Sequence, residues 1–265
     1  MRNRTLGLFQ RGDLGFRFRF IVLLLRCTII HAATANPDLL FHQGIEAYHA
    51  GNYSEASALF RQSALLRPAC GTIQNLGNAE WQLGHTGNAV LAWEQGRWLD
   101  PFNEALRGNL RFARKTAQLE TPELTWYEVV STWLPVNWWA WTAGASLWIA
   151  IGMGTLPGIL RWRKLAWHQA LAAVGLAVFL LSVPAQFGLS TRSRVGFILE
   201  KEVPLRLTPT AEAQYITRLA AGEPGRLLRK RGKYCLLRTS HSTGWVEQDQ
   251  FGLICRVPED RTSSF

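Results

Sequence analysis

The stretch WWAWTAGASLWIAIGMGTLPGILRWRKLAWHQALAAVGLAVFLLSVPAQFGL, residues 138–189, decides how the rest of the chain is arranged. It contains two apolar segments without charge, 138–160 and 165–189, separated only by residues 161–164. About 20 apolar helical residues cross the roughly 30 Å hydrocarbon core of a bilayer, so each segment is predicted to be a transmembrane helix. A connection of four residues, three of them cationic, predicts an antiparallel pair joined by a cytoplasmic loop. Both flanking regions then lie on the outer side of the membrane.

Tryptophan is concentrated around these two segments. Eight of the 12 Trp residues lie between positions 126 and 167. Trp favours the membrane–water interface, which indicates a membrane here rather than a Trp-rich soluble core. Half of the net charge of +10 is carried by the first 35 residues. This distribution weakens the usual inference from a high pI, which is nucleic-acid binding.

The first 35 residues have the order of a secretory signal sequence. A basic region is followed by an apolar region, 20–30, and by the small-residue site Ala33-Thr34-Ala35. We expect cleavage after Ala35 and therefore an exported N-terminal region. Arg26 interrupts the apolar region, so an uncleaved anchor remains the alternative.

A repeat with a shift of 33 follows the signal. The paired positions are Gly44/Gly77, Gly51/Gly84, Ala56/Ala89, Phe60/Trp93 and Pro68/Pro101. A period near 34 with glycine, alanine, an aromatic residue and proline in this order is typical of the tetratricopeptide repeat, an α-helical solenoid. We predict repeats at about 37–69 and 70–103 and a capping helix at 104–118 within a domain spanning 36–120. Gly44 and Gly77 are expected where paired helices cross closely, and Gly51 and Gly84 in tight turns.

The first helix of each repeat is expected to line a concave groove. Its candidate partner-binding positions are Ile45, Tyr48, His49, Asn78, Trp81 and Gln82, with Arg107 and Arg111 reaching the same surface. Amide and guanidinium groups together suit a carboxylate or an acidic peptide end. Under the alternative interpretation, Arg111 and Arg114 are simply part of a solvated helix face.

Short strands separated by glycine-containing turns are predicted in the C-terminal part of the chain. They begin at Val195, Val203, Thr217, Gly225, Tyr234 and Gly244, and together they suggest a small β-barrel over 195–257. The segments 204–206, 219–223, 232–237 and 243–246 resemble the bacterial SH3 domain, most specifically through Gly244-Trp245-Val246. The resemblance implies binding of peptides or cell-wall fragments, or a spacer role. Trp245 is expected to pack on the barrel.

A run of cations, Arg226, Arg229, Lys230, Arg231 and Lys233, is predicted to form a basic hairpin. It suits anionic lipid head groups or an acidic partner, or else it is a solubilising loop tip. An outward location permits a disulfide between Cys235 and Cys255, although spacing alone does not establish one. The sequence has no phosphate-binding loop, no His-Glu-x-x-His and no nucleophile elbow. We therefore predict a protein that is not an enzyme and has neither a cofactor nor a metal.

The order of signal, repeats with Asn109-Leu110 in the cap, two spans and SH3-like module resembles the BatE family of Bacteroides aerotolerance proteins. The resemblance implies a scaffold or adaptor in the bacterial inner membrane. It also implies membrane-bound von Willebrand factor A proteins and a MoxR-type AAA+ ATPase as partners. A peptidoglycan-binding accessory protein of the envelope is the alternative function.

Overall fold

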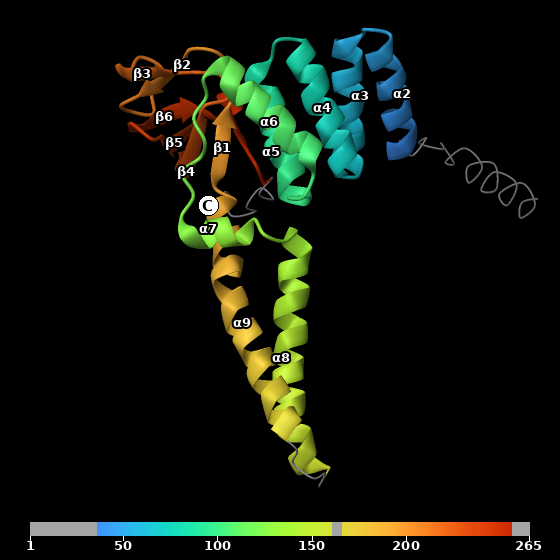
Figure 1. Cartoon of the computed structure of the whole chain (residues 1–265). Helices are drawn as coiled ribbons and strands as arrows, with labels where there is room; N and C mark the ends of the chain where they lie inside the picture. Colours follow the sequence, from blue (N-terminus) through green and yellow to red (C-terminus); the bar gives the residue numbers. More distant parts are fainter. Residues whose placement is uncertain (1–35, 161–165, 256–265) are drawn as a thin grey trace, which may run out of the picture. The chain divides into compact units, whose positions relative to one another are not determined.

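The computed structural model describes residues 36–160 and 166–255, which form eight α-helices and an antiparallel sheet of seven strands (Figure 1). The predicted signal sequence and the predicted cytoplasmic loop lie outside these residues. Two described helices are long and apolar enough to cross a membrane.

Five helices form the N-terminal part, called the helical region below. They are α2 (Pro37–His49), α3 (Tyr53–Leu66), α4 (Cys70–Gln82), α5 (Thr86–Leu99) and α6 (Glu104–Ala117). The first four pack as two successive hairpins, α2 with α3 and α4 with α5, and α6 packs on α5. Residues 37–69 and 70–103, the two predicted repeats, thus contain one hairpin each.

Glycine explains why these hairpins form. Gly51 and Gly84 have φ angles of 79° and 75°, which suit glycine in the turn after the first helix of each hairpin. A Cβ at Gly44 would lie 2.7 Å from the Phe60 ring, and one at Gly77 would lie 2.5 Å from the Trp93 indole nitrogen. Both roles predicted for these glycines are confirmed.

The two apolar helices are α8 (Val136–Ile159) and α9 (Ala166–Arg192). Gln186 of α9 donates to the Trp139 carbonyl of α8 at 3.1 Å, and a Cβ at Gly175 would lie 2.8 Å from the Ser146 carbonyl oxygen. The later residue of α9 thus meets the earlier residue of α8, so the two helices are antiparallel. Most of their large apolar side chains are exposed. A short helix that was not predicted from the sequence, α7 (Trp126–Ser131), precedes them.

The seven strands form the sheet module, in the order β3-β2-β6-β5-β4-β1-β7. Their bounds are β1 (Val195–Ile198), β2 (Val203–Arg206), β3 (Tyr215–Leu219), β4 (Pro224–Arg231), β5 (Tyr234–Arg238), β6 (Thr243–Glu247) and β7 (Phe251–Leu253). Strand β7 was not predicted from the sequence. The cations 229–231, which were expected in a hairpin loop, lie within β4.

The helical region and the sheet module share one hydrophobic core, which the sequence did not lead us to expect. The helical region contributes Ala89, Val90, Trp93, Leu106, Leu110 and Ala113, and the sheet module contributes Val195, Phe197 and Ile254. Gln95 of α5 also donates to the Leu253 carbonyl at 3.1 Å. These two parts are therefore one packed unit rather than two independent modules.

Candidate functional site

The predicted groove residues of α4 meet side chains of α6. Asn78 Oδ1 accepts hydrogen bonds from Trp93 Nε1 at 3.1 Å and from Asn109 Nδ2 at 2.9 Å. One turn further along α4, the Trp81 ring lies 5.7 Å from Trp93 and 5.6 Å from Phe112. Phe112 is 58% exposed and was not among the predicted site residues. We call Asn78, Trp81, Asn109 and Phe112 the α4–α6 cluster.

The cations beside the cluster differ in how they are paired. Arg107 donates to Glu104 Oε1 at 2.5 Å within α6. Arg114 is not a solvated side chain, because it forms an ion pair with buried Glu94. Arg111 is exposed, and it forms no ion pair with any residue that the structure describes. Of the predicted arginines on α6, Arg111 is therefore the exposed one without an ion pair among the described residues, and it directly precedes Phe112 in the sequence.

The other predicted site residues lie elsewhere. Tyr48 of α2 contacts Tyr53, with ring centroids 5.2 Å apart, and no ring contact or hydrogen bond in the described ranges joins it to the α4–α6 cluster. Arg229, Lys230 and Arg231 are exposed on β4, opposite β5. Trp245 is half-buried in β6, opposite Arg206 of β2 and Leu236 of β5.

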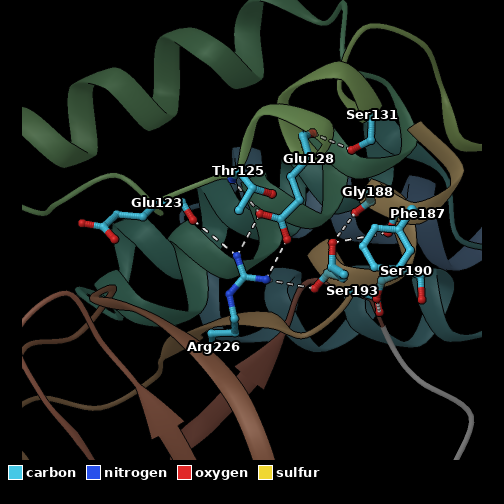
Figure 2. Close-up of polar contacts among 10 residues, drawn as sticks. Glu123, Thr125, Glu128, Ser131, Phe187, Gly188, Ser190, Ser193 and Arg226 are labelled. Carbon is cyan, nitrogen blue, oxygen red and sulfur yellow. Dashed lines mark hydrogen bonds and ion pairs between the residues drawn. The ribbon is translucent and has the colours of Figure 1, made fainter. Parts of the chain in front are cut away.

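A second site joins α7 to the sheet module, and we call it the junction cluster. Both Glu128 oxygens accept from Arg226 of β4, at 2.6 and 2.9 Å (Figure 2). Arg226 also donates to the backbone carbonyls of Thr191 and Glu123, at 3.3 Å each. The Glu128 side chain is fully buried. Arg226 therefore does not belong to an exposed basic hairpin, as was expected from the sequence.

Local sequence explains why Glu128 takes this position. Thr125 and Glu128 form a capping box at the start of α7, in which the Thr125 amide donates to Glu128 at 2.9 Å. Glu128 is also the only acid between residues 126 and 190. A Thr-x-x-Glu motif with a lone acid ahead of a long apolar segment was the signal from which α7 was predictable.

Arg226 sets the protonation state of Glu128. Burial by itself would raise the pKa of Glu128, but hydrogen bonds from Arg226 and from the Thr125 amide outweigh burial and lower the pKa to about 2. The carboxylate is therefore ionised at neutral pH. A tight ion pair that stays charged suits a structural connection rather than a proton-transfer group.

This pKa predicts an acid-sensitive junction. The pKa of Glu128 is lower in the folded state than in the unfolded state. The stabilisation that ionised Glu128 contributes is therefore complete above the ordinary pKa of 4.5, and it is lost as pH falls towards about 2. We expect the melting temperature of detergent-solubilised protein, followed by circular dichroism, to fall more steeply in this window for the wild type than for Glu128→Gln. Other acids, such as Glu80, contribute equally to both proteins, so parallel curves would contradict the assignment.

The described cysteines form no disulfide with one another. Cys70, Cys235 and Cys255 are free, so the disulfide considered between Cys235 and Cys255 is not formed. Burial raises the pKa of Cys235 to about 12, which keeps its thiol protonated. Among residues 36–160 and 166–255, no three His, Cys, Asp or Glu side chains gather in a metal-binding group.

The α4–α6 cluster and the junction cluster suit different roles. The α4–α6 cluster combines an exposed aromatic ring with amides, and the exposed Arg111 precedes that ring in α6. This composition suits recognition of another protein. In the junction cluster, the Glu128 side chain is buried, and its ion pair with Arg226 connects α7 to β4 of the sheet module. Comparison with protein-family models and with curated proteins gives no match.

Proposed function

We propose that this chain is a non-catalytic, membrane-anchored adaptor that binds a partner protein at the α4–α6 cluster. The observation that carries the proposal is Phe112, which is 58% exposed and lies against Trp81. The residue before it in α6, Arg111, is exposed and forms no ion pair with a described residue. A few hot-spot residues contribute most of the binding energy in protein interfaces, and they are enriched in Trp, Tyr and Arg. A partner segment with an apolar side chain followed by a carboxylate would satisfy both groups.

We also propose that the helical region consists of tetratricopeptide repeats and that the sheet module is a bacterial SH3 domain. The hairpins α2/α3 and α4/α5, with a close glycine contact in each, support tetratricopeptide repeats. The sheet module, with Trp245 between β2 and β5, supports a bacterial SH3 domain. A BatE-like role beside von Willebrand factor A proteins and a MoxR-type ATPase rests on the order of the segments alone.

The proposed location is the inner membrane of a bacterium. The α8–α9 hairpin spans the bilayer, while the helical region and the sheet module lie together on the outer face. Their common core supports this arrangement, because regions that share buried residues must be on the same side. An adaptor of this design holds its partner site in a fixed position rather than on a flexible tether.

The partner site is tested with two phenylalanines of equal exposure. Phe112 and Phe102 are both 58% exposed, and Phe102 is outside the cluster. We expect Phe112→Ala and Arg111→Glu to abolish recovery of crosslinked partners from native membranes, measured by quantitative mass spectrometry. Removing one aromatic anchor costs about 2 kcal/mol, or roughly 30-fold in affinity.

Phe102→Ala and Lys201→Glu are the matched controls, because both residues are exposed and lie outside the cluster. They should leave partner recovery unchanged. Equal losses for Phe112→Ala and Phe102→Ala would reject the α4–α6 cluster as the partner site. Failure to recover any reproducible partner, together with hydrolase activity of the purified protein, would reject the adaptor function itself.

Peptidoglycan binding through the sheet module is the second candidate function. The exposed Arg229, Lys230 and Arg231 on β4 favour an anionic polymer. Sedimentation with purified sacculi distinguishes the two candidates. The experiment requires the full chain in detergent, because an isolated sheet module would expose Val195 and Phe197 of the shared core.

A further inference from the structure

The short helix α7 presents two chemically different faces. Glu128 and Ser131 are buried, whereas Trp126, Val129 and Trp133 are exposed to 67%, 43% and 62%. With 3.6 residues per turn, positions 126, 129 and 133 fall on one side of the helix and Glu128 falls on the other. The Trp133 amide donates to the Val130 carbonyl at 3.1 Å, which continues the turn beyond Ser131.

Contacts with α9 and α8 place α7 beside the end of the apolar hairpin. The Tyr127 ring lies 5.3 Å from that of Phe187, and a side chain at Gly188 would collide with the Tyr127 backbone. Trp139 of α8 donates its indole N–H to the Ser131 carbonyl at 3.1 Å. Helix α7 therefore packs at the level of the last apolar turn of α9, next to the exposed Phe187.

Residues 126–160 add no charge to this exposed face. Glu128 is the only ionisable group between Thr125 and Arg161 apart from the weakly acidic Tyr127, and its charge is neutralised by Arg226 on the opposite side of α7. Indole rings are favoured at the head-group level, where the ring contacts acyl chains and the N–H finds a polar partner. We call Trp126, Val129 and Trp133 the α7 stripe; Tyr127 of the same helix contacts the exposed Phe187 of α9.

From this geometry we propose that α7 is an interfacial helix that inserts Trp126, Val129 and Trp133 into the outer head-group layer of the bilayer. The inference rests on the proposed membrane-spanning role of α8–α9. One face of α7 then contacts lipid, and the other binds the sheet module through the ion pair between Glu128 and Arg226. Helix α7 thereby fixes how the shared-core unit is oriented over the membrane surface.

Spin labels on the full chain in nanodiscs of phosphatidylethanolamine and phosphatidylglycerol test the proposal. The four native cysteines are replaced by alanine, and a nitroxide is attached at Val129→Cys, at Leu181→Cys of α9, or at Ala58→Cys of α3. Leu181 is 72% exposed on the hairpin and Ala58 is exposed on the helical region. Melting curves establish that each labelled protein remains folded. The readout is the accessibility of the label to oxygen, which is enriched in lipid, relative to a water-soluble nickel complex.

We expect labels at Val129 and Leu181 to have a high oxygen-to-nickel ratio, with a lower ratio at Val129 because it lies at the surface layer. The label at Ala58 should show the reverse preference. An aqueous signal at Val129 with a lipid signal at Leu181 would overturn the interfacial helix and leave the membrane hairpin intact. Low accessibility of Val129 to both reagents would also overturn it, because a protein would then cover the stripe. An aqueous signal at Leu181 would reject the transmembrane hairpin and the proposed function with it.

Discussion

Replacing Arg226 with methionine is expected to lower the free energy of unfolding by about 3–5 kcal/mol, because it leaves the buried Glu128 carboxylate without its counter-ion. Hydrogen bonds to the carbonyls of Thr191 and Glu123 are lost with the same substitution. Chemical denaturation of the solubilised protein, followed by circular dichroism, measures the change. Methionine keeps much of the length of arginine, so the effect reports charge and hydrogen bonding more than lost volume.

Arg229→Met is the matched control, because Arg229 lies on the same strand with an exposed side chain. Exposed substitutions of this kind stay within about 0.5 kcal/mol. The double variant Glu128→Leu with Arg226→Met should recover most of the lost stability, since two apolar groups leave no buried charge. If Arg226→Met and Arg229→Met were equally stable, the junction cluster would not connect α7 to β4 in the protein.

The junction cluster illustrates which features of the structure can be predicted from the sequence and which cannot. Local patterns predicted the helices well, because Gly51 and Gly84 mark turns and the apolar runs determine α8 and α9. Glu128 and Arg226 are 98 residues apart, and nothing in the spacing of a single sequence relates them. The run containing Arg226 and residues 229–231 therefore suggested one basic hairpin, although only the later cations are exposed.

Short elements were missed for a related reason. Helix α7 has six residues and β7 has three, too few for a hydrophobic period to stand out. In the candidate site, Trp81 and Asn78 were predicted because they occupy the first helix of a predicted repeat. Phe112 stands 34 residues after Asn78, but it was not predicted because the corresponding position of α4 carries an amide instead of an aromatic ring.

Helix α5 packs closely against the first strand, β1. Gly87 lies in the first turn of α5, where any Cβ would collide with the backbone oxygens of Ile198 and Leu199. Backbone atoms cannot rotate away as a side chain can, so a larger residue must displace β1. That strand contributes Val195 and Phe197 to the shared core. Gly87→Leu is therefore expected to destabilise the protein by more than about 3 kcal/mol, the upper range for overpacking.

Gly108→Leu provides the control, because Gly108 lies within α6 and a Cβ added there would have no neighbouring atom within 4 Å. Leucine has the higher helix propensity, so this variant should be as stable as the wild type or slightly more stable. For Gly87→Leu, we expect the single melting transition to split and a protease to cleave the connection 118–125 between α6 and α7. A single unchanged transition would mean that the helical region and the sheet module are not joined through α5. The proposed adaptor would then present its candidate partner site on a movable domain, because the proposed fixed orientation depends on this contact as much as on Glu128 and Arg226.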